Sequence, residues 1–271
     1  MFKIISIILI SACFLFANDK VIEKIVNDYN PKIPISEFKF TKSQLDELCG
    51  VNHYSSVCET TSIYTENELR KKRIKYLLEE ISEKFNIEKK LVTNLNDTFI
   101  KYMEENQEIV KFSLDCYSSI CYEKTIWTEL FYFENILTFV LTDKIDEESK
   151  TDFEIEDIMV NYNKIIEQLP YLKLKKEYEV DINYDYIQNH FFAIDKSWKE
   201  YESTFIEFLK QINKYDDIEW QKIFYSHRYD SLVTITEYFY SITPAIDSKT
   251  DASVQLEIKD EKSFINIHKL K

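Results

Sequence analysis

The sequence predicts a mainly α-helical bundle held by disulfides, and three observations support this fold class. Apolar residues recur at helical spacing over most of the chain. The 271 residues include one glycine and four prolines, and no proline- or glycine-rich linker splits the chain. Nineteen tyrosines and nineteen phenylalanines supply large apolar side chains through which helices can pack. The chain is therefore long and apolar enough to bury one large core or two small ones.

The first 17 residues have the composition of a secretory signal peptide. A lysine at position 3 precedes an uncharged, apolar run from Ile4 to Ala17, and polar residues follow from Asn18. The run is shorter than the roughly 20 apolar residues that a membrane-spanning helix needs. We therefore expect cleavage after Ala17 and export of the mature chain.

The same segment contains a second processing signal. Residues 10–13, Ile-Ser-Ala-Cys, resemble a bacterial lipobox. Processing there would leave Cys13 at the new terminus, where an attached lipid would anchor the protein to the envelope membrane. The sequence thus predicts a periplasmic or secreted protein, with an anchored lipoprotein as the alternative and membrane contact only through Cys13.

Removal of the signal peptide leaves four cysteines, and an even number in an exported chain predicts two disulfides. They are Cys49, Cys58, Cys116 and Cys121. Bonds from Cys49 to Cys116 and from Cys58 to Cys121 would close loops of about 60 residues, worth roughly 4 kcal/mol each. Bonds within each close pair are the alternative. A zinc site is disfavoured, since the short C-x-x-C spacing of its ligands is absent.

The helices of the first half follow from apolar spacing and capping patterns. The capping-box pattern Thr65–Glu68 predicts the start of one helix, and a second begins at about residue 88. A third, unusually aromatic helix is expected over about 122–141. The acidic stretch 143–152 follows and predicts a loop between two halves.

The second half repeats this organisation. Residues 151–154 predict the cap of a fourth helix, and Pro170 stops it. Two more helices are expected at about 184–213 and 217–241, and alternating apolar residues around a charged turn predict a small C-terminal β-hairpin. The predicted organisation is a signal peptide at 1–17, a cysteine-bearing helical unit at 18–142, a second helical unit at 153–242 and a hairpin tail at 243–271.

The two helical units share a pattern in their second and third helices. The corresponding positions are Phe99 and Trp198, Tyr102 and Tyr201, Phe133 and Arg228, and Leu137 and Leu232. Degenerate duplication of a three-helix unit would explain these matches. Chance similarity between amphipathic helices of like composition would explain them as well.

Charge restricts the partners that this protein can bind. The chain has 34 basic and 48 acidic side chains, a formal charge of −14, which becomes −15 when Lys3 leaves with the signal peptide. Such a surface repels nucleic acid and anionic lipid head groups and attracts a cationic partner. The simpler interpretation is that acidity keeps an exported protein soluble.

The sequence has no pattern typical of catalysis. With one glycine it cannot build phosphate-cradling loops, dinucleotide fingerprints or the nucleophile elbow of serine hydrolases. The four histidines lack the spacing of metal ligands, and His227 beside Arg228 is better explained as a packed or half-exposed surface residue. Adjacent glutamates are more simply a solvated helix face. We expect a binding protein and not an enzyme, without catalytic, cofactor-binding or metal-binding residues and without a cofactor.

The order of these motifs resembles the LprI-type lysozyme inhibitor family. In the first unit, Cys49-x8-Cys58 precedes an amphipathic helix, an aromatic-x-x-tyrosine segment and two more cysteines. In the second unit, Trp198 and the Arg228-x3-Leu232 pattern match the tryptophan-containing helix and the later arginine-containing helix of that family. The resemblance therefore extends over most of the mature chain.

Each unit also departs from the family. Phe99 and Phe133 occupy the tryptophan and arginine positions of the first unit, and the second unit lacks the cysteines. The resemblance implies an exported helical protein that inhibits a cationic cell-wall hydrolase such as lysozyme without covalent chemistry. It also implies that the disulfides hold a loop, His53–Ser56, preorganised for binding. A structural or adaptor protein of the periplasm is the alternative.

Overall fold

The computed structural model is mainly helical, as the sequence predicts. It describes residues 19–50, 55–110, 119–144, 154–168, 172–174, 184–237 and 239–242. Residues 19–28 are helical, and the elements that follow are η1 (Ile35–Glu37), α2 (Lys42–Cys49), α3 (Ser56–Phe85), α4 (Lys89–Val110), α5 (Ser119–Thr142), α6 (Ile155–Gln168), β1 (Leu172–Leu174), α7 (Tyr184–Gln211), α8 (Ile218–Glu237) and β2 (Phe239–Ile242).

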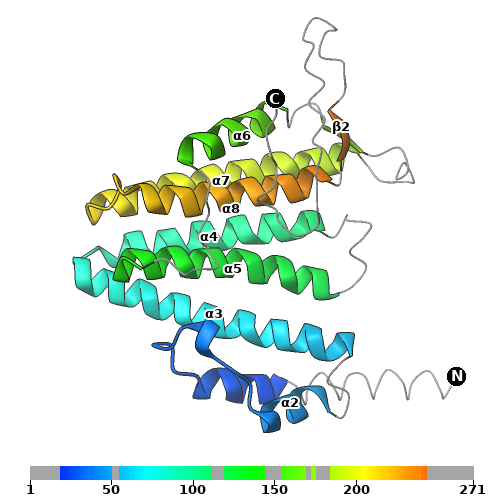
Figure 1. Ribbon diagram of the computed structural model, residues 1–271, viewed down its shortest axis with the longest axis vertical. Helices are drawn as coiled ribbons and strands as arrows, with labels where there is room; N and C mark the ends of the chain where they lie inside the picture. The colour runs from blue at the N-terminus through cyan, green and yellow to red at the C-terminus, as the bar shows by residue number, and fades with distance from the viewer. Residues whose placement is uncertain are drawn as a thin grey trace, which may run out of the picture.

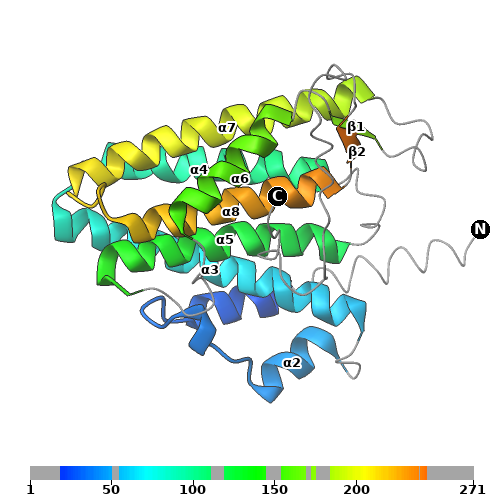
Figure 2. The ribbon, with the colours of Figure 1, turned by 45° about the horizontal axis from the view of Figure 1, so that its top comes forward.

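The long helices lie in successive layers. In Figure 1, α6 is at the top, followed by α7 with α8, then α4 with α5, then α3, with α2 and the helix of residues 19–28 at the bottom. Helix α3 packs along α5, α4 along α7 and α6 against α8. The turned view in Figure 2 keeps these neighbours together. The central layers thus join the two predicted helical units through α4 and α7.

A single hydrophobic cluster runs through these central layers. Its members come from α3, α4, α5, α7 and α8, so both predicted units contribute to it. Burial of each large apolar side chain contributes about 1.5–3 kcal/mol. The largest fully buried aromatic residues are Trp198, Trp220, Tyr102, Tyr201, Phe99, Phe133, Phe205, Phe208 and Phe224.

A second, smaller cluster attaches the N-terminal segment to α3. Ile22 and Ile25 of the first helix, together with Tyr29, pack with Leu48 of α2 against Leu69 of α3. These packed residues begin five positions after Ala17, the last residue of the predicted signal peptide. The predicted signal peptide itself, with Cys13, lies outside the described residues.

The capping box predicted at Thr65 is wrong, because α3 begins nine residues earlier. Ser55 caps this helix by accepting a hydrogen bond from the Cys58 backbone N–H at 3.1 Å. Thr65 lies inside the helix, where its hydroxyl donates to the carbonyl of Thr61 at 2.7 Å. The pattern of a threonine followed three residues later by a glutamate also occurs within charged helices, and there it caps nothing.

Each of the six predicted helices corresponds to one of α3 to α8. Helix α8 ends at Glu237 and not near residue 241, because residues 239–242 form β2 and pair antiparallel with β1. Val, Ile, Tyr and Phe favour strands, and the four residues of β2 include Phe239 and Ile242. The predicted cap of α6 at 151–153, its stop at Pro170 and the C-terminal hairpin at 243–271 lie outside the described residues.

Helix α2 was not predicted from the sequence. It starts with a true capping box, in which Thr41 accepts from the Gln44 N–H at 3.2 Å and Gln44 accepts from the Thr41 N–H at 2.8 Å. Gly50, the one glycine, ends it with a φ of 62°, a conformation that other residues adopt at a cost. Among the described helices, none has an apolar stretch that could cross a bilayer.

Candidate functional site

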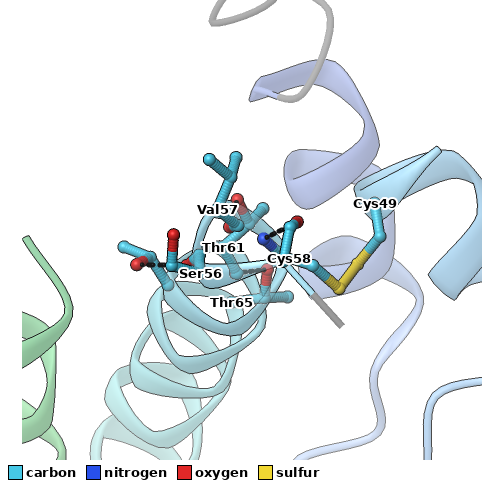
Figure 3. Close-up of a disulfide and its surroundings, with 8 residues drawn as sticks. Cys49, Ser56, Val57, Cys58, Thr61 and Thr65 are labelled. Carbon is cyan, nitrogen blue, oxygen red and sulfur yellow. Dashed lines mark hydrogen bonds between the residues drawn. A yellow bond between two sulfur atoms is a disulfide. The ribbon is translucent and has the colours of Figure 1, made fainter. Parts of the chain in front are cut away.

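A disulfide joins the end of α2 to the first turn of α3. Cys49 and Cys58 are bonded, with their Cα atoms 4.7 Å apart (Figure 3). This is the bond within the first close pair, and it excludes the pairing of Cys49 with Cys116 and of Cys58 with Cys121. Cys116 and the side chain of Cys121 lie outside the described residues, as do His53 and Tyr54 of the predicted binding loop. The rest of that loop contains Ser55, which caps α3.

Helix α3 also holds the N-terminal helix by its carboxyl end. The ammonium of Lys72 donates to the backbone carbonyls of Val26, Asn27 and Tyr29 at 2.7, 3.0 and 2.8 Å. Carbonyls at a helix end lack partners within the helix, and a lysine there satisfies them. The disulfide and this contact therefore fix both N-terminal helices on the outer side of α3.

A buried ion cluster links α3 to α5. Glu134 of α5 accepts hydrogen bonds from Arg70 and from Arg73 Nε, the latter at 2.6 Å, and these side chains are 5–7% exposed. Arg73 also donates to the carbonyl of Pro31 at 2.7 Å. The Arg70 guanidinium lies 4.8 Å from the centre of the Trp127 ring. The cluster therefore connects α3, α5 and the N-terminal segment.

Residues at corresponding positions of the two predicted helical units contact one another at the centre of the molecule. Tyr102 and Tyr201 are stacked with ring centres 5.9 Å apart. Phe99 of α4 contacts Tyr201 at 5.5 Å, and the corresponding Trp198 of α7 contacts Tyr102 at 5.1 Å. Each unit thus places its first aromatic residue against the tyrosine of the other unit.

Side chains of the third helices also contact the tyrosine of the other unit, and one ion pair joins corresponding positions. Phe133 lies 5.8 Å from the Tyr201 ring, and the Arg228 guanidinium lies 5.7 Å from the Tyr102 ring. Lys101 and Glu200, which each precede one of the two tyrosines, form an ion pair at 2.5 Å. Contacts between corresponding positions are therefore approximately symmetric about the Tyr102–Tyr201 stack.

A buried polar group lies beside this stack. Glu129 of α5 accepts from Asn106 at 2.5 Å and from Ser231 at 3.2 Å, and its second oxygen lies 2.9 Å from His227 Nε2. His227 is packed, with Tyr132 stacked on its ring at 4.3 Å. Burial, and secondly the charge of Glu129, raise the pKa of Tyr102. Glu129 thus connects α5 with α4 through Asn106 and with α8 through Ser231 and His227.

An open depression lies between α4 and α7, lined in part by Thr98, Phe192 and Lys196. The charges at its rim are largely paired, since Asp195 contacts Lys199 at 2.6 Å and Glu200 contacts Lys101. In the part of the chain that the structure describes, no three potential ligands gather as a metal site would require. The depression therefore has little unpaired charge with which to orient a small molecule.

Comparison with known proteins identifies no relatives. No family model matches this chain, and no curated protein or solved structure does either. The resemblance to LprI-type inhibitors thus stays a prediction from the motifs.

Proposed function

We propose that this chain is an exported acidic protein that binds a cationic partner without covalent chemistry, and that a lysozyme-type cell-wall hydrolase is the partner to test first. The observation that carries the proposal is the excess of acidic side chains on a disulfide-bonded helical scaffold. A stable, inert binding surface requires no catalytic group.

The Cys49–Cys58 disulfide supports export. Disulfides persist in oxidising compartments such as the periplasm or the extracellular space, and are rare where glutathione keeps thiols reduced. The N-terminal run to Ala17 provides the means of export, either as a cleaved signal peptide or as a lipoprotein signal at Cys13. Both routes deliver the described helices to the same oxidising side of a membrane.

The distribution of charge supports a cationic partner. The charged side chains buried in the described residues are three arginines, Arg70, Arg73 and Arg228, and two glutamates, Glu129 and Glu134. Within the described residues, burial therefore removes no net negative charge from the surface, and the chain as a whole carries −14. Such a surface accelerates encounter with a cationic protein, and the acceleration falls with salt over a Debye length of about 10 Å at 0.1 M.

The central contacts support the proposed relation to LprI-type inhibitors and the proposed duplication. The family positions of the second unit come together, since the Arg228 guanidinium lies 5.2 Å from the centre of the Trp198 ring. In the first unit, Phe99 and Phe133 replace this pair and stack at 4.0 Å. We propose that both units derive from one three-helix ancestor, and that the first exchanged a cation–π contact for an aromatic one.

A clearance assay tests the proposed function. The exported, oxidised protein is added to lysozyme acting on a peptidoglycan suspension, at low and at near-physiological ionic strength. We expect slower clearance at low ionic strength and a smaller effect at higher salt. Unchanged clearance at both would exclude lysozyme as the target. A stable endogenous partner recovered from an envelope extract by the same protein would then favour the structural or adaptor alternative.

A further inference from the structure

The first turns of α3 present an apolar face that no described element covers. Val57 is 68% exposed and Tyr64 is 40% exposed. The two are seven residues apart, which is about two helical turns, so they lie on one side of the helix. Figure 3 shows Val57 pointing away from the disulfide that holds this end of α3. Thr61 lies between them on the same side, so this part of the helix surface offers two exposed large side chains separated by a small one.

Carboxylates border this face. Glu68 follows Tyr64 by one turn, and Glu123 of α5 is held nearby by Asn67, whose side chain donates to the carboxylate at 2.9 Å. Burial first, and then the charge of Glu68, raise the pKa of Tyr64, and Glu123 raises it further while Lys71 lowers it. We call Val57, Tyr64, Glu68 and Glu123 the Tyr64 face.

Of the two carboxylates in the Tyr64 face, Glu123 is the one with which a basic side chain of a partner can pair. Glu68 is paired with Lys71 at 2.7 Å, but Glu123 forms no ion pair with any described residue. Burial raises the pKa of the Glu123 carboxyl and so disfavours its ionised form, and the Asn67 hydrogen bond and the charge of Lys71 offset this only in part. A cation placed beside it would relieve this cost, and the Tyr64 ring next to it offers a cation a π face.

We propose that the Tyr64 face receives a lysine or arginine side chain of the cationic partner. This assignment rests on the proposed function and specifies where it acts. The occupant follows from charge complementarity, because an exposed aromatic ring and an unpaired carboxylate together favour a basic side chain. The face is also rigid, since the disulfide and the Asn67 hydrogen bond fix its two sides and reduce the entropy lost on binding.

Two matched pairs of variants test the assignment. Val57→Lys puts a positive charge in the face, and Val160→Lys makes the same change on α6, where the valine is 52% exposed. Tyr64→Ala removes the ring, and Tyr215→Ala removes a comparably exposed tyrosine in the α7–α8 turn, at the opposite end of the helices (Figure 1). Affinity is measured by titration calorimetry with two probes, egg-white lysozyme and an oligolysine peptide. Circular dichroism confirms that every variant folds.

We expect Val57→Lys and Tyr64→Ala each to weaken binding by about tenfold or more, and the two control variants by less than about twofold. Equal effects of a variant and its control would overturn the Tyr64 face and leave the proposed function standing. If oligolysine binds and both Val57→Lys and Tyr64→Ala weaken that binding, while lysozyme does not bind, the assignment of the Tyr64 face is supported and lysozyme is excluded as the target. Absence of binding to both probes would overturn both proposals.

Discussion

Replacement of Glu134 by glutamine tests whether the buried ion cluster holds α5 to α3. The variant keeps the shape of the side chain but leaves Arg70 and Arg73 without a carboxylate. Both guanidinium groups and the carboxylate are 5–7% exposed, so water cannot replace the lost contact. Removal of one partner of a buried ion pair costs about 3–5 kcal/mol. Glutamine retains one carbonyl acceptor, so we expect the lower end of this range.

The assay is urea unfolding followed by circular dichroism, with a thermal scan beside it. A loss of about 3 kcal/mol corresponds to a drop in Tm of about 6–12 °C for a chain of this size. The matched control is Glu68→Gln, which breaks an exposed pair with Lys71 and should cost less than about 1 kcal/mol. A Glu134→Gln variant no less stable than this control would refute the reasoning.

A second variant separates unpaired charge from lost packing. When Glu134→Leu is combined with Arg70→Met and Arg73→Met, no charge remains buried without a partner. Apolar replacement of a whole buried ion cluster is often neutral or stabilising. We therefore expect the triple variant to recover most of the stability that Glu134→Gln loses, apart from the contact of Arg73 with the Pro31 carbonyl. A triple variant as unstable as Glu134→Gln would show that the cluster acts through packing.

Four further measurements check other parts of the structure. Cys49→Ala with Cys58→Ala opens a short loop and should lower the free energy of unfolding by about 2.5 kcal/mol in urea titrations, whereas an unchanged midpoint would contradict the bond. Asn86 ends α3 at φ 53°, so Asn86→Ala should cost about 1 kcal/mol and Asn86→Gly should not, as thermal scans would show. Burial raises the pKa of Tyr29 from 10 to about 12, so its neutral form stabilises the fold fully below pH 10, and this contribution should disappear between pH 10 and 12 in an alkaline stability series. Because burial raises the pKa of Glu123, Glu123→Gln should not lower the Tm, and a clear decrease would show that the carboxylate is structural.

The long helices were predictable because their apolar spacing continues over many turns. The start of α3 was not, because Thr60 and Thr61 have low helix propensity. In the helix their hydroxyls donate back to the carbonyls of Ser56 and Val57, each at 2.8 Å. Helix α2 is too short for a periodic signal, although its capping box at Thr41 could have revealed it. The β1–β2 pairing joins segments far apart in sequence, and no local pattern predicts such contacts.

The buried charges were missed for a different reason. Arg70 and Arg73 lie on the same side of α3 as Leu77, and a charged residue on a helix normally indicates the solvent face. Their burial depends on Glu134, which is more than 60 residues away in sequence. A signal was present, because arginines interrupt an apolar stripe at helical spacing. Only the tertiary partner, however, makes their burial tolerable.

The central contacts also show why the two predicted units work as one structure. The first unit supplies Glu129 and Tyr102, which contact His227 and Arg228 of the second. Without the first unit, His227 would lose the carboxylate of Glu129, and Arg228 would lose its contact with the fully buried ring of Tyr102. The correspondence between 18–142 and 153–242 therefore describes a proposed common origin, while the core is shared. A partner bound at the end of α3 would thus dock on a rigid body, because the buried ion cluster ties α3 to α5 and the shared core ties α5 to both units.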